Sequence, residues 1–484
     1  MESAASNRCT DSPPPHRADC PPLTPDARDG APLQRGPDLT DSPAPSRSSQ
    51  ARLLWSIALP AMLTNVATAL FGLADMWAIG RLGDAPAQGA VELGAKYMMG
   101  LLNVFNFLRT STVALTAQGS GRGDRGAQAE TLARASAVAM GIGAILLCLM
   151  PMAIPLGLDL LEAEGALREN AGHYIAIRYW AAPLWLGNCV LVGWLIGQRL
   201  VRHVLVVEIA ANAVHIALDL FLVLVVEWGV TGVATATFCS ELFKFAVLAA
   251  LILRRPEARD AFAAARQRAT WRRAELTRLF ALNRDLFLRT LLLTAALLAF
   301  ARTGAQAGPV TLAANGILFQ LFMLATLLLD GFESAAQVLC GEAVGARRRE
   351  HFRMTVRSAL FWGGVMGLAL TLAYALGGRP LAATFNTDPQ VIAATATYAP
   401  WLTMLPLLGV SAYVLDGVFV GAGWTRAMMA TMLAAMAAYA LLLWLLHSMG
   451  NHGLWAAFTL FFVVRAAGQM IVLPGLERRS FSAS

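Results

Sequence analysis

Residues 53–83 read LLWSIALPAMLTNVATALFGLADMWAIGRLG, and the run is almost free of charge between Arg52 and Arg81. An apolar run of this length predicts a transmembrane helix. The exception within it is Asp75, a carboxylate that is unfavourable in hydrocarbon and therefore marks a candidate functional site. Pro60 removes a helix hydrogen bond and predicts a kink or a bending point. Two interpretations stay open: a moving, ion-coupled helix, or a paired structural carboxylate beside a static kink.

The amino-acid composition predicts that the whole chain is a polytopic membrane protein. Of its 484 residues, 57% are hydrophobic and 14% are charged, whereas soluble proteins carry about 25% charged residues. The net charge of +7 comes almost entirely from arginines in loops, so it does not indicate a nucleic-acid partner. None of the six cysteines lies at metal-ligand spacing, and we expect neither a metal nor a cofactor.

Twelve apolar segments follow Arg52. They predict an all-α polytopic membrane protein with twelve transmembrane helices, and several exceed the roughly 20 residues that a bilayer requires, so we expect tilt. The segments are residues 53–80, 88–118, 131–158, 171–197, 204–227, 231–253, 278–303, 311–340, 353–377, 390–420, 427–448 and 453–473.

The loops between these segments alternate in charge. One set holds the arginines at 122, 125, 199, 202, 254–273, 347–353 and 426. The opposite set is poor in arginine and often acidic, as at Asp159, Glu162 and Glu164. The positive-inside rule places the arginine-rich set in the cytoplasm, and both termini then lie on that side.

Composition also predicts the domain organisation. Residues 1–50 hold ten of the 22 prolines and no apolar run, which predicts a disordered Pro-rich cytoplasmic tail and not a signal peptide. The Ala/Arg-rich stretch 254–277 predicts a cytoplasmic linker, part of it an interfacial amphipathic helix. It separates an N-terminal six-helix bundle, 51–253, from a C-terminal six-helix bundle, 278–475. A short cytoplasmic tail, 476–484, ends the chain.

Three motifs recur at a separation of about 220 residues, which predicts an internal duplication. The pairs are Gly193-x-x-x-Gly197 with Gly417-x-x-x-Gly421, Gly229-x-x-Gly232 with Gly450-x-x-Gly453, and QGSGRGDRG at 118–126 with CGEAVGARR at 340–348. An even number of helices per repeat keeps both halves in the same orientation. We therefore expect a pseudo-two-fold axis along the membrane normal and a central cleft between the bundles.

The fifth segment contains NAVHIALD, with Asn212, His215 and Asp219. His215 and Asp219 are four residues apart and share one helix face. At ~1.5 Å per residue, Asp75 and Asp219 lie about 9 and 12 Å below the outer ends of their helices, and Thr237 about 8 Å. Two carboxylates, an imidazole and a hydroxyl at a similar depth predict a proton-binding cluster. The alternative is a satisfied Asp219–His215 pair without a role in transport.

Other ionisable residues in the apolar segments receive structural interpretations. We expect Glu241 to pair with Lys244, and Asp285 with Arg289, because each pair is three or four residues apart on one helix. Further intramembrane or nearby candidates are Arg109, Glu208, Asp330, Glu333 and Asp416, and of these Asp330 and Asp416 are candidates for the C-terminal wall of the cleft. No nucleophile elbow, phosphate loop, HExxH or paired CxxC is present, so we do not expect an enzyme.

The chain resembles the MATE (multidrug and toxic compound extrusion) family, most closely its DinF-like branch, over about residues 52–475. The resemblance rests on ALPAMLTNVATALFGLADMWAIGRLG, FLRTSTVALTAQGSGRGD, NAVHIALD followed by GVTGVATAT, ALNRDLFLRT, LLDGFE and YVLDGVFVGA. It implies a twelve-helix, two-lobe exporter of organic cations or other amphipathic compounds, driven by H⁺ or Na⁺ influx. It also implies a monomer in the bacterial inner membrane, embedded in the lipid bilayer.

The resemblance also assigns residues. Asp75 and Asp219 match the family's first-helix and fifth-helix aspartates, Thr237 matches its sixth-helix threonine, and Pro60 matches its bending proline. Phe71 and Asn212 are expected to line the substrate or ion cavity.

His215 departs from the family pattern, because relatives usually have asparagine four residues before the fifth-helix aspartate. An imidazole is a poor ligand for a hard cation such as Na⁺, so the departure favours protons. We expect Asp75 to take a proton in exchange with Asp219 and His215, after which the first helix bends about Pro60 and releases the substrate. The alternatives are Na⁺-coupled multidrug efflux and a flippase for a lipid or a lipid-linked precursor.

Overall fold

The computed structural model describes residues 47–80, 84–385 and 388–482. Within the first helix, the side chains of residues 70–76 also lie outside the described part, so the structure does not test Phe71 and Asp75. Contacts assign the described residues to one compact unit, Ala44–Ser484.

Every regular element in the described residues is helical. The long helices are α1 (Arg47–Gly80), α2 (Ala85–Asn103), α3 (Phe107–Gly121), α4 (Arg125–Leu160), α5 (Gly165–Gly197), α6 (Val201–Leu220), α7 (Gly229–Leu253), α9 (Arg273–Gln306), α10 (Pro309–Gly345), α11 (Arg349–Phe385), α12 (Pro389–Ala422), α13 (Thr425–Leu445) and α14 (Gly450–Phe481). A 3₁₀ turn, Val104–Asn106, joins α2 to α3, so together they form the second predicted segment. Ten of the described helices are long and apolar enough to cross a membrane.

Local sequence signals explain where several helices begin. The side chains of Asp84, Asp124 and Asp388 accept hydrogen bonds from the first backbone N–H groups of α2, α4 and α12. These caps satisfy amide groups that have no partner inside the helix. At the other end of α12, Gly423 adopts φ 77°, a left-handed conformation that ends the helix.

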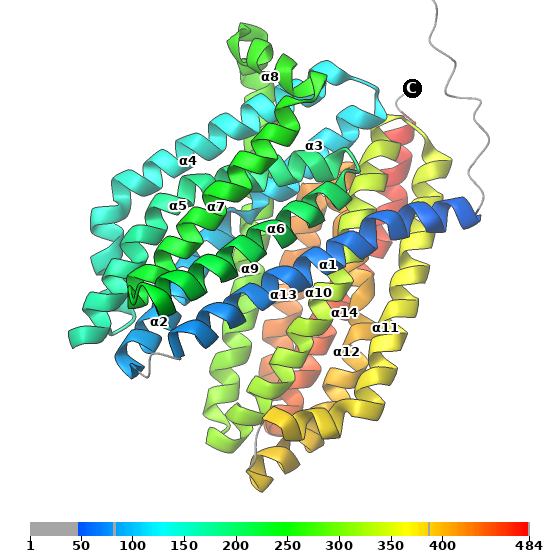
Figure 1. The fold of residues 1–484 in the computed structure, drawn as a ribbon. Helices are drawn as coiled ribbons and strands as arrows, with labels where there is room; N and C mark the ends of the chain where they lie inside the picture. Colours follow the sequence, from blue (N-terminus) through cyan, green and yellow to red (C-terminus); the bar gives the residue numbers. More distant parts are fainter. Residues whose placement is uncertain (1–46, 81–83, 386–387, 483–484) are drawn as a thin grey trace, which may run out of the picture. The chain divides into compact units, whose positions relative to one another are not determined.

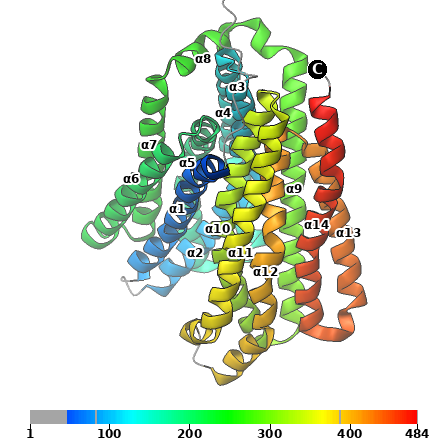
Figure 2. The same ribbon diagram turned by 90° about the vertical axis from the view of Figure 1, so that its right-hand side faces the viewer.

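The helices form two bundles (Figures 1 and 2). The N-terminal half comprises α1–α7, and the C-terminal half comprises α9–α14. A short helix between them, α8 (Pro256–Arg266), packs against α4 and buries Ala258, Ala261 and Ala264 along one face. Part of the predicted linker is therefore an amphipathic helix, and this helix packs against α4.

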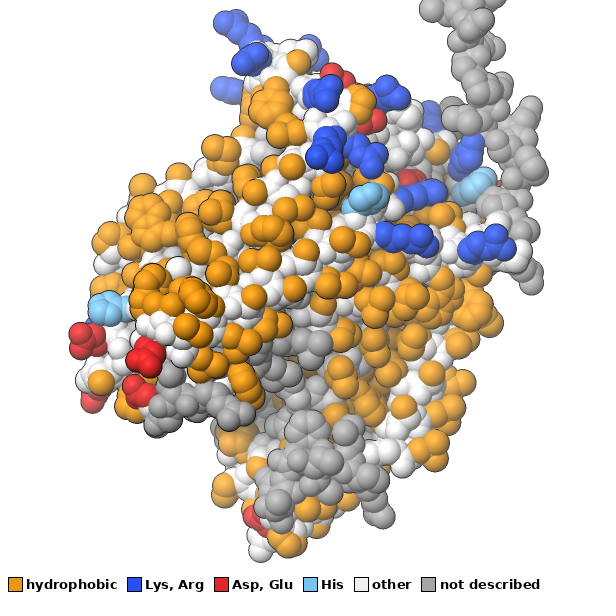
Figure 3. Space-filling model, viewed as in Figure 1, with side chains coloured by type: hydrophobic (Ala, Val, Ile, Leu, Met, Phe, Trp, Pro, Cys, Tyr) orange, Lys and Arg blue, Asp and Glu red, His pale blue; other side chains and the backbone are white. Residues whose placement is uncertain are grey.

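The surface has the pattern of a membrane protein. Along α4, Met152 and Leu156 are 75% and 70% exposed, a degree of apolar exposure that suits lipid and not water. Hydrophobic side chains cover the flanks of the helices, whereas Lys and Arg gather at the end where α8 lies (Figure 3). We call this end, which also holds the loops after α3 and α10, the arginine-rich end.

The two halves contact each other near the arginine-rich end through glycines. A Cβ atom on Gly121 of α3 would overlap the carbonyl oxygen of Glu342 on α10, and a Cβ on Gly345 of α10 would overlap that of Gln118 on α3. The Gln118 side chain also donates a hydrogen bond of 2.8 Å to the carbonyl of Gly421 on α12. The helix backbones therefore touch directly, and this reciprocal contact agrees with the predicted duplication.

Candidate functional site

A cavity of about 290 Å³ lies between the two halves, near the lower limit of typical ligand pockets, about 300–1,000 Å³. Helices α1, α3, α9, α10, α12 and α14 contribute to its walls. Its aromatic lining consists of Phe107, Phe322, Tyr413 and Phe462. Its charged and amide lining is shared by the two halves: Asn65, Asn103, Asn106 and Arg109 in the N-terminal half, and Arg289, Asp330, Glu333 and Gln337 in the C-terminal half.

Behind the C-terminal wall lies a fully buried carboxylate, Asp416, which has 0% of its surface exposed. It forms ion pairs with Arg289 and, at 3.5 Å, with Arg465. The side chain of Gln469 also donates a hydrogen bond of 2.6 Å to Asp416. Asp330 therefore lies in the cavity wall, whereas Asp416 lies outside the lining and is paired with the lining residue Arg289.

The predicted pair of Asp285 with Arg289 is wrong. Asp285 instead accepts hydrogen bonds from Arg284 at 2.8 Å and from Thr425 of α13 at 3.1 Å. Arg289 instead reaches across to α12 and pairs with Asp416.

Asp330, Glu333 and Arg109 differ from the other ionisable residues of the cavity. Each is partly buried, and none makes a hydrogen bond or ion pair through its side chain with another residue in the described ranges. Asp330 and Glu333 are three residues apart on α10, so they lie on one helix face. A cavity inside a membrane thus presents two carboxylates from one half and a guanidinium from the other.

The predicted proton-binding cluster lies inside the N-terminal half. His215 and Asp219 are 0% and 1% exposed. The Nδ1 atom of His215 lies 3.4 Å from the hydroxyl of Ser240 on α7. Thr237 is also buried on α7 and donates to the carbonyl of Val233 at 3.0 Å. The structure therefore brings the fifth-segment and sixth-segment residues to one interface between α6 and α7.

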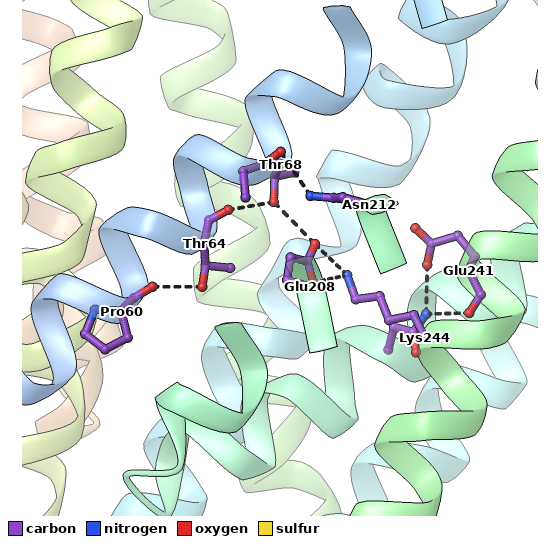
Figure 4. Close-up of polar contacts among 9 residues, drawn as sticks. Pro60, Thr64, Thr68, Glu208, Asn212, Glu241 and Lys244 are labelled. Atoms are coloured by element: carbon purple, nitrogen blue, oxygen red, sulfur yellow. Dashed lines mark hydrogen bonds and ion pairs between the residues drawn. The ribbon is translucent and has the colours of Figure 1, made fainter. Parts of the chain in front are cut away.

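Two polar contacts connect α6 to α1. The side chain of Asn212 donates to the carbonyl of Ala67 at 3.0 Å, and the hydroxyl of Thr68 lies 3.3 Å from the carboxylate of Glu208. Figure 4 shows both contacts beside Lys244, whose ammonium group lies 2.6 Å from Glu208. The predicted pair of Lys244 with Glu241 is therefore wrong.

Glu208 was not assigned a role from the sequence, although its spacing contained the signal. Residues 208, 212, 215 and 219 follow one another at intervals of four, three and four, which places them on one face of a helix. All four positions carry polar side chains in an otherwise apolar segment. Glu241, in turn, accepts a hydrogen bond of 2.7 Å from Asn188 of α5.

Pro60 lies in the interior of α1, which runs through it from Arg47 to Gly80. Beyond the proline, Thr64 donates to the carbonyl of Pro60 at 2.8 Å, and Thr68 donates to that of Thr64 at 2.9 Å (Figure 4). Threonine side chains that bond back to residue i−4 weaken the ladder of a helix and promote bending. The Pro60–Thr68 stretch of α1 is therefore the part best suited to change shape.

Comparisons with known proteins agree with this architecture. A protein-family model described as MatE matches the chain over residues 60–221 and 286–445, one stretch in each half. DNA damage-inducible protein F of Escherichia coli strain K12 is 34% identical over 418 residues, which cover 86% of this chain and 91% of that protein. The probable multidrug resistance protein NorM of Thermotoga maritima is 23% identical over 343 residues, covering 70% and 73%.

Solved structures show the same fold. A crystal structure of MATE in the bent conformation has a TM-score of 0.80 at 18% identity and covers 90% of this chain and 98% of that chain. A MOP superfamily transporter from Pyrococcus furiosus has a TM-score of 0.77 at 20% identity and covers 89% and 96%. The predicted all-helical membrane fold of two pseudo-symmetric bundles is thereby confirmed.

Proposed function

The chain belongs to the MATE family of secondary transporters, and from this premise we propose that it exports organic cations or other amphipathic compounds in exchange for protons. The proposal places it in a bacterial inner membrane with both termini in the cytoplasm. It divides the chain into bundles 51–253 and 278–475, joined by the cytoplasmic linker 254–277. A MATE protein is a transporter and not an enzyme.

The observation that carries the proton coupling is the buried polar face of α6. His215 and Asp219 are almost inaccessible, and Asn212 on the same face bonds directly to α1. A change of charge on this face alters the contact between α6 and α1, because the same face holds both helices together. Protonation and helix movement are therefore linked through one interface, with Asp75 as the proposed proton acceptor on α1.

An imidazole within the cluster favours protons over Na⁺. Hard cations prefer oxygen ligands, and the Nδ1 atom of His215 faces a hydroxyl at 3.4 Å.

Transport by this route requires two states with different affinities. The halves touch at the arginine-rich end, and under the proposed orientation we assign this arrangement to an outward-facing state. Protonation of the α6–α1 cluster lets α1 repack and lowers the affinity for the substrate, which then leaves. Coupling depends on this difference, since a ligand that binds both states equally shifts neither.

A flippase for lipid-linked anions receives less support from the same cavity. Such a substrate would need a continuous cationic lining. Of the two arginines that line the cavity, Arg289 is neutralised by Asp416, and two carboxylates lie on the same wall.

The test uses purified protein in liposomes with an imposed pH gradient and Na⁺-free buffer. We expect the gradient to drive movement of a fluorescent organic cation. Asp75→Asn and Asp219→Asn should each abolish this movement while leaving the protein folded. The control is Glu92→Gln, which removes a surface carboxylate that is paired with Lys96, and it should transport normally. Efflux at the wild-type rate in Asp75→Asn, or strict dependence on Na⁺ at every pH, would refute the proposed coupling.

A further inference from the structure

Two adjoining cavities lie at the arginine-rich end, apart from the cavity of the candidate functional site. The larger has a volume of about 590 Å³ and is lined by α3, α9, α14 and the start of α13. The smaller, of about 220 Å³, lies between α3, α4 and α9. Leu115, Gln118 and Arg278 line both. We call the two together the seam cavities, because α3 and α4 belong to the N-terminal half and the other helices to the C-terminal half.

The carboxylates in the lining of the seam cavities are each already paired with an arginine. Arg134 of α4 is buried and lies 2.5 Å from Glu130 and 3.6 Å from Glu275 of α9. Asp285 accepts a hydrogen bond of 2.8 Å from Arg284. These carboxylates therefore hold helices and side chains of the fold in place.

Three further arginines of the lining remain without a carboxylate partner. Arg122 follows α3, Arg278 lies in the second turn of α9, and Arg426 lies in the first turn of α13. All three are exposed, and none forms an ion pair within residues 47–80, 84–385 and 388–482. Guanidinium groups bind phosphate oxygens through two parallel hydrogen bonds. An anion that enters the seam cavities therefore meets guanidinium groups from both halves.

The lining becomes apolar with depth. At ~1.5 Å per residue, Leu115 of α3 and Leu282 of α9 lie about 9 Å and 14 Å from the ends of their helices at the arginine-rich end. Arg122 and Arg426 lie at helix ends, and long arginine side chains such as that of Arg278 extend toward the interface. A ligand with an anionic head and an apolar chain matches this order of side chains from the surface inward.

We propose that the seam cavities bind an anionic phospholipid. Its phosphate head lies against the guanidinium groups of Arg122, Arg278 and Arg426, and an acyl chain follows Leu115 and Leu282 into the bilayer. Basic pockets between transmembrane helices on the cytoplasmic side hold the head groups of such lipids. The inference goes beyond the proposed function, because this lipid is a bound ligand and not the transported substrate.

A lipid at this place also affects the contact between the halves. Gln118 lines both seam cavities, and its side chain donates a hydrogen bond of 2.8 Å to the carbonyl of Gly421. Its own carbonyl lies where a Cβ atom on Gly345 would be. The bound lipid contacts both halves beside these groups, so it favours the arrangement in which the halves touch.

Native mass spectrometry of the purified, delipidated protein tests the inference, because it counts the lipid molecules that stay bound. The probes are dioleoylphosphatidylglycerol, dioleoylphosphatidylcholine and glycerol 3-phosphate. The second has the same chains but a choline that neutralises the phosphate, and the third has the anionic head without chains. The wild type should bind phosphatidylglycerol about 10- to 100-fold more tightly than either of the others, as expected for one hydrogen bond to a charged group.

Variants locate the site. Arg278→Gln should lower the affinity for phosphatidylglycerol to that for phosphatidylcholine, whereas Arg278→Lys should keep part of the preference. Ala281→Phe fills the larger cavity without a change of charge and should weaken the binding about 10-fold. The controls are Arg202→Gln, an exposed arginine of α6, and Ala295→Phe, an exposed alanine of α9, and both should bind like the wild type. A melting curve on each variant confirms that it is folded.

The inference is overturned if the wild type does not distinguish phosphatidylglycerol from phosphatidylcholine, or if Arg202→Gln weakens the binding as much as Arg278→Gln does. Full binding in Ala281→Phe would also overturn it, because the lipid would then lie elsewhere on the surface. Glycerol 3-phosphate binding as tightly as the phospholipid would assign the seam cavities to a soluble organic phosphate instead. None of these measurements uses transport, so their outcome is independent of the proposed function.

Discussion

The two lysines of the chain lie in opposite environments. Lys244 and its partner Glu208 have 16% and 10% of their side-chain surfaces exposed, whereas Lys96 and Glu92 have 68% and 49%. A buried ion pair contributes little compared with apolar residues, but removing one partner leaves an uncompensated charge. Exposed pairs of this kind contribute about 0–1 kcal/mol. Residue environment and not residue type therefore decides what each lysine does.

We predict that Lys244→Met lowers the free energy of unfolding by about 3–5 kcal/mol, because Glu208 is left buried and charged. Lys96→Met is the matched control and should change it by less than about 1 kcal/mol. Adding Glu208→Gln to Lys244→Met should restore most of the loss. The measurement is unfolding by SDS titration in mixed micelles. Equal effects of the two lysine substitutions would show that the Glu208 pair is not a buried contact.

For single residues, the sequence predicted which helix face a polar side chain lies on, but it did not predict the ion-pair partners of buried charges. The spacing of His215 and Asp219 placed them on one helix face, and both are buried on α6. Both intrahelical ion pairs were wrong, because Lys244 and Arg289 reach carboxylates on neighbouring helices. Sequence spacing reports neighbours along a helix, whereas the partner of a buried charge depends on which helix packs opposite. Asp75 remains a prediction, since its side chain lies outside the described residues.

Among the helices, α1 combines the proline with the contacts to α6. Its carbonyl groups at Pro60 and Thr64 accept side-chain bonds from the following turns, and Thr68 continues to Glu208. The backbone hydrogen bonds of α1 are thus weakened at Pro60, and two turns later α1 contacts α6. A bend at Pro60 would therefore change the distances of the Thr68–Glu208 and Asn212–Ala67 contacts.

We predict that Pro60→Ala preserves or raises thermal stability and lowers proton-driven efflux. Alanine restores the backbone hydrogen bond, and helix interiors favour alanine over proline by about 3 kcal/mol. A bent state would then have to break that bond. The control is Pro474→Ala in α14, an exposed intrahelical proline, which should leave efflux unchanged. If Pro60→Ala is instead less stable and fully coupled, the proline is a static kink.

The helix boundaries were largely predictable because apolar runs in a bilayer must form helices to satisfy their backbone. The arginine-rich linker was predicted in part, and α8 is the amphipathic helix within it. The division of the second segment into α2 and α3 at Val104–Asn106 was not predicted. A single 3₁₀ turn leaves the hydrophobic pattern intact, so composition gives no sign of it.

In the whole molecule, the two halves meet through backbone contacts that leave no room for side chains. Gly121 and Gly345 occupy equivalent positions, and each lies against the backbone of the other half. The duplicated glycine motifs predicted the repeat, and the family model matches once in each half. Of the charged residues that line the cavity, the sequence assigned only Asp330 to the wall, because which helix faces turn toward the cavity depends on how the helices pack.

We predict that Gly345→Ala separates the halves at the arginine-rich end, because its Cβ overlaps the carbonyl oxygen of Gln118. Spin labels at Arg202 and Arg426, which are exposed and lie in different halves, should move apart in pulsed electron resonance measurements. The labels are introduced as cysteines in a variant that lacks the native ones. Gly316→Ala on the same helix has no heavy atom within 4 Å of its new Cβ and should leave the distance unchanged. An unchanged label distance in Gly345→Ala would mean that the contact tolerates a methyl group.

The contact between α3 and α10 also limits how the two repeats can diverge. Gly121 and Gly345 each lie against a backbone carbonyl of the other half, at Glu342 and Gln118. A side chain gained at either glycine therefore has to be accommodated by the backbone of the other repeat. A change in one half at this contact is thus a change for both, and the two copies are not free to vary independently there.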